Sequence, residues 1–295
     1  MKPVHLIICS LCFFFKVDPV SAELSLHKLT SLSNAKIVHD SSIIPYLTYY
    51  GLDAYGSSHI IGTFKSDSFV CVGQIYRPCG PSRGTVIFLH GLFDHVGTNK
   101  NAIVACLQEN YTFAAFDLPG HGLSSGKRGS IRDFREYADA LGSFLKICDT
   151  LTSLPYVFIG HSTGCAVALE YLSSTKQQPF AKIVFLAPLL RSASFRSLSM
   201  GYKIFHNFRI IPRRWHRKSS HDKEAMKRFR NDPLQPKIFA VEWAGAYFSW
   251  FDRIKDMPEH QFPLVVIQGT DDKAVDWKYN LPWFEKKIKG VRVVK

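Results

Sequence analysis

Short apolar runs alternate with amphipathic stretches from residue 85 onward, a pattern typical of βαβ units and a mostly parallel sheet. The continuous apolar runs predict buried strands, at 85–89, 112–116, 156–159, 183–186, 264–267 and 291–294. Apolar positions at helical spacing predict helices, at 101–108, 131–147 and 164–172. Ahead of these, residues 59–64 and 69–76 predict an antiparallel pair at the edge of the sheet. The pattern therefore predicts an α/β fold with helices on both faces of the sheet.

The alternation breaks between about residues 191 and 259, which are rich in Arg, Lys, Trp and Phe and contain a proline-punctuated passage at 232–236. Because this stretch separates two core strands, we expect an inserted helical cap above the carboxyl ends of the strands, where ligands bind in open α/β sheets. The 295 residues have room for one such domain. The predicted divisions are a signal peptide at 1–22, a first core part at 45–190, a cap at 191–259 and a second core part at 260–295.

The signal peptide is predicted from Met1-Lys2, the apolar run 3–15 and the small-residue cleavage pattern at 20–22. The run is shorter than the roughly 20 apolar residues that span a bilayer, so an uncleaved anchor is the lesser alternative. We expect the protein to be exported, either periplasmic or secreted, and association with a membrane is a further expectation.

Seven cysteines fall to five after residue 22, and an odd number leaves at least one thiol free. Cys71 and Cys79 lie in or at the end of one extended segment, where eight residues span about 26 Å, beyond the reach of a disulfide. Cys165 is interpreted as a small buried apolar residue. No spacing indicates a zinc site, and we expect neither metal nor cofactor.

The composition, with 46% hydrophobic and 21% charged residues, is that of a globular protein, but its charge is uneven. Residues 191–230 carry twelve Lys and Arg against two acidic residues, which is +10 of the formal +13. Interleaved Phe, Ile and Trp side chains indicate a cationic amphipathic surface facing anionic lipid headgroups, while a solvated basic face is the alternative. No nucleic-acid-binding module is present, so nucleic acid is not an expected partner.

The strongest chemical signal is the G-x-S-x-G sequence at 160–164, placed between a predicted strand and a predicted helix. That context is typical of a nucleophile elbow with Ser162 as the nucleophile. Its glycines leave room for a strained serine backbone, and the helix that follows directs its N-terminal dipole at the reacting centre.

Two further segments supply the expected partners of Ser162. The loop 88–93 follows the first core strand, and the backbone N–H groups of Leu92 and Thr163 are the predicted oxyanion donors. His90 in this loop is interpreted as a structural residue that hydrogen-bonds within the loop. The strand 264–267 is followed by acids, of which Asp272 is the preferred triad acid and Asp271 and Asp276 are alternatives.

The chain resembles the monoglyceride lipase and lysophospholipase branch of the α/β-hydrolases, which is grouped by similarity with certain serine aminopeptidases. The resemblance covers about residues 45–295 and rests on a set of motifs, namely His90-Gly91, 116–124 with Gly126, 160–164, 231–234, and Gly269 with Asp272. It implies an α/β-hydrolase fold and the same roles for Ser162, Asp272, Leu92 and Thr163. The implied substrate is a lipid ester such as a monoacylglycerol or lysophospholipid.

The resemblance also implies a histidine base after the last strand, but no histidine follows Asp272 in this sequence. The final helix that the resemblance implies is missing as well, so we expect that the C-terminal end of the fold is absent. A triad serine without its base keeps roughly 10³ to 10⁴ of rate enhancement over water, having lost a factor on the order of 10⁶. We therefore expect this chain to be nearly inactive and a version extended through the histidine to be active.

Three functions remain open from the sequence. The leading hypothesis is a carboxylic ester hydrolase that acts on lipid esters through an acyl-enzyme at Ser162. The second is a non-catalytic protein, truncated or a pseudoenzyme, that binds lipid in the same pocket. The third is a peptidase of the same branch.

Overall fold

An eight-stranded sheet organises the chain, which a computed structural model describes at residues 29–34, 43–52, 58–175, 178–205 and 223–295. The strand order is β1-β2-β4-β3-β5-β6-β8-β10. The strands of this sheet are β1 Ser58–Ser66, β2 Phe69–Arg77, β3 Thr85–Leu89, β4 Thr112–Phe116, β5 Tyr156–His161, β6 Phe180–Leu186, β8 Leu264–Ile267 and β10 Arg292–Val294. The pairs β1–β2 and β2–β4 are antiparallel and the other pairs are parallel. The predicted α/β class with a mostly parallel sheet is confirmed.

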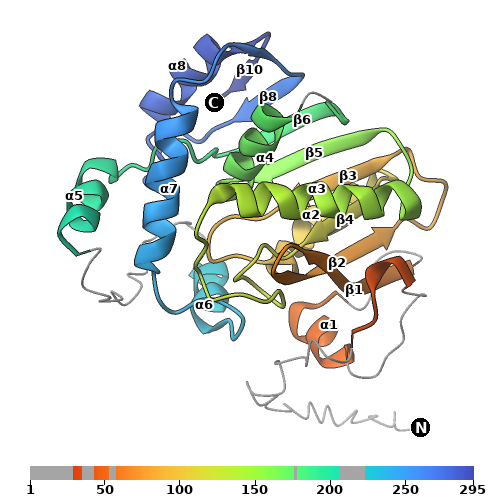
Figure 1. Ribbon diagram of the computed structural model, residues 1–295. Helices are drawn as coiled ribbons and strands as arrows, with labels where there is room; N and C mark the ends of the chain where they lie inside the picture. The colour runs from red at the N-terminus through yellow and green to blue at the C-terminus, as the bar shows by residue number, and fades with distance from the viewer. Residues whose placement is uncertain (1–28, 35–42, 53–57, 176–177, 206–222) are drawn as a thin grey trace, which may run out of the picture.

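Helices cover the sheet on both sides, with α3 and α4 in front of it in Figure 1. The helices are α1 Ile44–Tyr50, α2 Lys100–Gln108, α3 Phe134–Leu151, α4 Thr163–Ser174, α5 Phe195–Phe205, α6 Lys223–Asn231, α7 Val241–Ile254 and α8 Trp277–Lys287, with 3-10 turns η3 Leu32–Asn34 and η4 Val96–Asn99. A separate parallel pair is formed by β7 His260–Gln261 and β9 Ile288–Lys289. Helices α1 and α8 and this small pair were not predicted.

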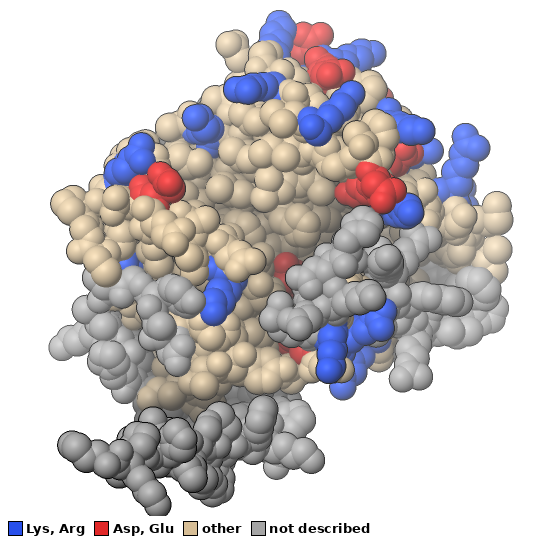
Figure 2. Space-filling view, turned by 180° about the vertical axis from the view of Figure 1, so that it is seen from behind, with Lys and Arg blue, Asp and Glu red and all other residues tan. Residues whose placement is uncertain are grey.

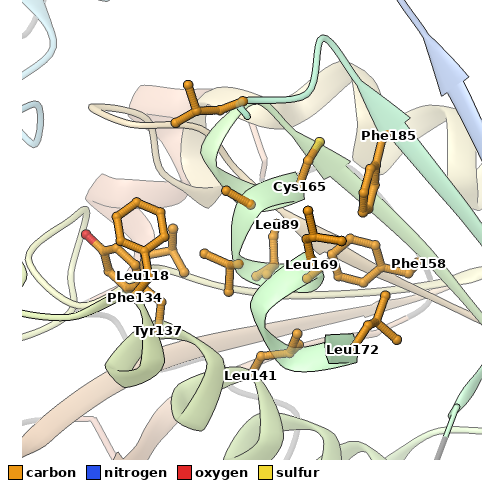
Figure 3. Packing of buried hydrophobic residues seen from close by; sticks show 14 of the residues in the cluster. Leu89, Leu118, Phe134, Tyr137, Leu141, Phe158, Cys165, Leu169, Leu172 and Phe185 are labelled. Atoms are coloured by element: carbon orange, nitrogen blue, oxygen red, sulfur yellow. The ribbon is translucent and has the colours of Figure 1, made fainter. Parts of the chain in front are cut away.

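Two hydrophobic cores lie on opposite faces of the sheet. The larger core joins the sheet to α3, α4 and α7, and Figure 3 shows Leu89, Phe158 and Phe185 of the strands beside Cys165 and Leu169 of α4. On the other face, the smaller core lies between the strands β1, β2, β3 and β4 and the helices α1 and α2. Side chains alternate between the two cores along a strand because successive strand residues point to opposite faces.

Helix α7 lies within the predicted cap but packs into the larger core. Trp250 is fully buried, and its ring stacks on Phe134 of α3 at a centroid distance of 5.1 Å. In Figure 1 α7 stands upright at one side of the sheet, next to α5. The residues 191–259 therefore include a helix that completes the core, and their assignment as a cap stays a prediction.

Part of one sheet face carries apolar side chains that are only half-buried. The register aligns Ile159, Val184 and Val265 in one row across β5, β6 and β8, while Leu186, Ile267 and Val294 form the next row. Ile267 is 43% exposed and Val294 is 38% exposed. Figure 2, viewed from behind, shows a broad uncharged surface with a hollow on the side away from α3 and α4.

Two of the predicted features cannot be followed in the described part of the chain. The predicted signal peptide at 1–22 and the basic stretch at 206–222 lie outside the described residues. None of the helices that the structure describes combines the length and the apolar character that a membrane span needs. The five cysteines after residue 22 are all free thiols, with Cys71 buried in β2 and Cys79 exposed.

Candidate active site

Ser162 is the single residue between the end of β5 and the start of α4. Its backbone adopts φ 50° and ψ −109°, which is a strained conformation for a residue with a side chain. Three backbone hydrogen bonds hold it, because its N–H donates to Leu186 O at 2.9 Å and its carbonyl accepts from Leu189 N and from Cys165 N, both at 3.1 Å. The sharp bend leaves Ser162 half-buried, at the carboxyl end of a central strand.

Three glycines make this bend possible. A Cβ added to Gly164 would lie 2.3 Å from Leu89 O, and one added to Gly160 would lie 2.9 Å from Cys165 N. A Cβ on Gly91 would lie 3.3 Å from Ser162 Cβ, so the loop after β3 passes directly against the serine. The structure therefore places Ser162 at the elbow that the G-x-S-x-G motif predicts, while its catalytic role stays a prediction.

The two predicted oxyanion donors lie on either side of this contact. Leu92 follows Gly91 and is half-buried, and Thr163 is fully buried as the first residue of α4. Within the described residues neither backbone N–H donates a hydrogen bond. Amides that lack a partner inside the protein are available to an oxygen of a bound substrate. The loop that carries Leu92 passes against Ser162 and Thr163 directly follows it, while their role as oxyanion donors stays a prediction.

The contacts of the three candidate acids separate them. Asp272 is half-buried, and its carboxylate accepts hydrogen bonds from Gln268 Nε2 at 3.1 Å, Ala274 N at 2.7 Å and Val275 N at 3.1 Å. These bonds fix the direction of the carboxylate, as an acid that orients a base requires. Asp272 therefore remains the preferred triad acid.

The alternatives have other partners. Asp271 is exposed and lies 3.6 Å from Lys273 Nζ, while Asp276 Oδ2 lies 3.4 Å from Arg191 Nε. Asp271 is thus a solvated loop carboxylate. Asp276 instead joins the start of the predicted cap to the start of α8.

The start of the predicted cap is tied to the loop of the acid. Ala193 N donates to Ala274 O at 3.0 Å, and Asp276 N donates to Arg191 O at 2.8 Å. Leu189, two residues before Arg191, donates its N–H to Ser162 O at 3.1 Å. The start of the predicted cap, which is named the cap entrance, therefore connects Ser162 to the loop after Asp272.

The histidines near the site are bound in structural roles. His90 Nε2 accepts from Leu118 N at 3.0 Å and its Nδ1 donates to Gly91 O at 2.8 Å, as the structural interpretation of this residue expects. Burial lowers the pKa of His90, and it lowers the pKa of His121 to about 3. Both rings are therefore neutral near neutral pH.

No described histidine bonds to Ser162 or to Asp272. His161 precedes the nucleophile with an exposed side chain, and His260 lies in the small β7–β9 pair. Among the described residues no side chain hydrogen-bonds to Ser162 Oγ. The described part of the chain also contains no group of three metal-ligating side chains.

The sequence did not predict a role for Asp94, His95 or Asp232. Asp94 ends the loop 91–94, which carries the Leu92 amide and is named the oxyanion loop. Burial raises the pKa of Asp94, but its interactions with His90, Thr98 and His95 lower that pKa overall. His95 bonds to Asp232 at 3.1 Å. The family motif at 231–234 contains Asp232 and was the signal that could have drawn attention to it.

Comparison with known proteins identifies the family of the chain. The family model of serine aminopeptidase, S33, matches residues 80–287. Phospholipase YtpA of Bacillus subtilis is 26% identical over 214 residues, which cover 68% of this chain and 80% of that protein. A putative monoglyceride lipase of Schizosaccharomyces pombe is also 26% identical, over 64% of this chain and 53% of that protein.

Solved structures share the fold. The monoacylglycerol lipase of Paleococcus ferrophilus superposes with a TM-score of 0.63 at 22% identity, over 75% of this chain and 86% of that chain. A soluble variant of the Saccharomyces cerevisiae monoglyceride lipase gives a TM-score of 0.64 at 15% identity, over 78% of this chain and 84% of that chain. The chain belongs to the serine aminopeptidase S33 family, in the monoglyceride lipase and lysophospholipase branch of the α/β-hydrolases.

Proposed function

We propose that this protein hydrolyses lipid esters, such as monoacylglycerols or lysophospholipids, through an acyl-enzyme at Ser162. The observation that carries the proposal is the half-buried serine at φ 50°, beside two backbone amides that donate to no other described residue. Family membership supports lipase or esterase chemistry in general.

The proposed reaction has two steps. Ser162 Oγ attacks the ester carbonyl carbon, and the oxygen that becomes negative accepts hydrogen bonds from the amides of Leu92 and Thr163. The intermediate collapses to an acyl-serine as the alcohol leaves with a proton. Water then adds to the acyl-serine and releases the fatty acid, which restores the hydroxyl.

Because no described histidine bonds to Ser162 or Asp272, we propose that this chain turns over slowly. The oxyanion hole and substrate binding alone retain roughly 10³ to 10⁴ of rate enhancement. Three hydrogen bonds fix the direction of the Asp272 carboxylate, and this supports the assignment of the triad acid.

Labelling by a fluorophosphonate tests the nucleophile. We expect the probe to attach at Ser162, with a second-order rate constant at least about 10³-fold below that of the Paleococcus ferrophilus enzyme assayed in parallel. Ser162→Ala should abolish labelling, whereas Ser194→Ala at the cap entrance should not. Labelling that persists in Ser162→Ala would refute the nucleophile, and a rate equal to that of the archaeal enzyme would refute slow turnover.

A second candidate function is lipid binding without turnover, favoured by the same lack of a histidine contact. Isothermal titration with a non-hydrolysable ether analogue, compared with fatty acid release from the matching ester, separates the two. Binding with no release of acid above the Ser162→Ala background would favour the binding protein. Release of an amino acid from an aminoacyl amide but not from the lipid ester would instead favour a peptidase.

We further propose that the basic residues of 191–230 bring the site to an anionic membrane surface. Twelve Lys and Arg against two acids in this stretch support the proposal. Co-sedimentation should be stronger with vesicles rich in anionic lipid than with neutral vesicles, and should weaken with added salt. Equal binding to both kinds of vesicle would argue against it.

A further inference from the structure

Three segments that are far apart in the sequence meet at one buried carboxylate beside the oxyanion loop. Tyr50 at the end of α1 donates its hydroxyl to Asp232 Oδ1 at 2.9 Å. His95 Nε2 lies 3.1 Å from Asp232 Oδ2. The side chains of His95 and Asp232 are 0% and 4% exposed. Such a contact is shielded from water, so removing one partner leaves a buried polar group unpaired.

Both oxygens of the Asp232 carboxylate accept hydrogen bonds. Its Oδ1 also accepts from Leu234 N at 2.8 Å, which fixes the turn after α6. Nε2 of His95 faces the carboxylate, so this nitrogen carries the proton and donates it. The edge of the Tyr50 ring also contacts the His95 ring, with a centroid distance of 5.0 Å and an interplanar angle of 78°.

The protonation of His95 follows from its surroundings. Burial by itself lowers the pKa of His95, but the bond and charge of Asp232 and the charges of Asp117 and Asp94 raise the pKa above its ordinary value. The charge of His95 in turn helps burial to lower the pKa of His90. The contact is thus between an anion and a ring that is readily protonated.

His95 is three residues after Leu92, and the loop between them is short and well tied. Asp94 N donates to Gly91 O at 3.2 Å, and His95 N donates to Asp94 Oδ1 at 3.0 Å. On the far side of His95, Val96 N donates to the buried Asp117 at 2.7 Å. A displacement of His95 is therefore passed to the backbone that carries the Leu92 amide.

A second contact joins the same loop to the same stretch of the predicted cap. Phe93, with a strained φ of 67°, lies against Phe239 at a centroid distance of 6.0 Å. Leu92 thus precedes two successive attachments to residues 232–239, one aromatic and one polar. A movement of residues 232–239 would therefore also move the backbone that carries the Leu92 amide.

We propose that Asp232, acting through His95 and with Tyr50, is a positioning residue that holds the oxyanion loop 91–94 in place for acyl transfer. The inference rests on the proposed function, because it gives the Leu92 amide the role of an oxyanion donor. Such donors act at 2.7–3.1 Å from the developing charge, and a misplacement of about 1 Å costs on the order of 100-fold in rate.

The test compares Asp232→Asn and His95→Gln with the unaltered protein. The second-order rate constant of fluorophosphonate labelling should fall by about tenfold to 100-fold, while the dissociation constant of a non-reactive ether lipid should change less than about twofold. Tyr50→Phe should have a smaller effect, because Leu234 N still bonds to the same carboxylate oxygen.

His59→Gln is the matched control. His59 is a half-buried histidine of the β1–β2 pair, stacked on Tyr76 at a centroid distance of 4.0 Å, and none of the described hydrogen bonds or ring contacts joins it to the oxyanion loop. A role in stability alone predicts that His59→Gln and His95→Gln lower the melting temperature and leave the labelling rate unchanged below it. Unchanged labelling in His95→Gln and Asp232→Asn would overturn the proposal.

Amide hydrogen exchange gives an answer that does not depend on activity. In Asp232→Asn and His95→Gln the amides of residues 91–96 should exchange at least about tenfold faster, while those of α4 and of His59→Gln should not. If Ser162 itself is not labelled, the proposed function fails and the exchange result still decides whether Asp232 positions the loop. Unchanged exchange in the loop would overturn the inference whatever the labelling shows.

Discussion

Ser162 has a positive φ, and the structure around it shows why the flanking positions are glycines. Leu89 O leaves no space for a Cβ on Gly164, and Cys165 N leaves none on Gly160. The strained backbone of Ser162 costs on the order of 1–3 kcal/mol and persists because β5, β6 and α4 hold both sides of it. The conformation of Ser162 therefore depends on the missing side chains of Gly160 and Gly164 as well as on the serine itself.

Gly164→Ala tests this crowding. The new methyl group would meet Leu89 O at 2.3 Å, so β3 and α4 must move apart, and we expect the free energy of unfolding to fall by about 1–3 kcal/mol or more. Fluorophosphonate labelling should slow as well, because Thr163 lies next to the displaced residue. Urea denaturation and labelling rates measure the two effects.

Gly201→Ala is the control for that substitution. Gly201 lies inside α5 with nothing within 4 Å of the added Cβ, so alanine should be neutral or stabilise by up to about 1 kcal/mol. A loss of stability at Gly201 equal to that at Gly164 would show that the close approach of Leu89 is not the cause.

At the scale of elements, helix α7 belongs both to the predicted cap and to the core. Trp243 and Trp250 on α7 contact Phe134 of α3, and the Tyr247 ring stacks on Trp243 at 5.5 Å. These aromatic side chains lie within the stretch 191–259 that the sequence predicts as a cap. In the structure they form the contact that attaches this stretch to the sheet.

Trp250→Ala measures the strength of this attachment. Removing a fully buried indole should lower the free energy of unfolding by about 3–5 kcal/mol, through lost burial and the cavity that remains. Met200→Ala on α5, where the side chain is 64% exposed, should change it by less than about 0.5 kcal/mol. Chemical denaturation of both variants checks the pair, and a loss below 1 kcal/mol for Trp250→Ala would show that α7 is only loosely attached.

At the scale of the whole molecule, the parallel sheet is covered unevenly. Parallel sheets usually bury both faces. Here the row formed by Leu186, Ile267 and Val294 is partly exposed among the described residues. Neighbouring positions of β8 therefore differ sharply, because Val266 is 0% exposed and Ile267 is 43% exposed.

Lysine placed at each of these neighbours tests that arrangement. Val266→Lys buries an unpaired charge and should cost about 4 kcal/mol or more, while Ile267→Lys should cost less than about 1 kcal/mol. Ile267→Lys should also weaken binding of a hydrophobic dye, since it interrupts the exposed apolar row. Comparable destabilisation by both variants would contradict the assigned faces of β8.

Most of the strands could be predicted because each is a short apolar run between turn residues. The strands at 85–89, 112–116 and 264–267 have the predicted bounds, and the others differ by one to three residues at their ends. Helix α8 was missed because Pro282 lies inside it and argues against a helix. The core packing of α7 was missed because hydrophobic spacing shows which face is apolar, but not which element covers it.

The site divides in the same way between what the sequence contains and what folding adds. Ser162, Thr163 and Leu92 could be named because a strand, a tight turn and a helix in series impose local geometry that the motif records. The sequence favoured Asp272 but left Asp271 and Asp276 as alternatives, because the hydrogen bonds of Asp272 to Gln268 and to backbone amides form only in the folded loop.

The sequence by itself determined the α/β class, the order of the strands of the main sheet along the chain and the position of Ser162 at a tight turn between a strand and a helix, since periodicity and turn chemistry act over a few residues. The tertiary structure alone decided that Tyr50, His95 and Asp232 meet, 137 and 182 residues apart along the chain. It also decided which apolar face α7 covers and which face stays partly open. Such contacts depend on how the elements pack together, and no local pattern in the sequence specifies that packing.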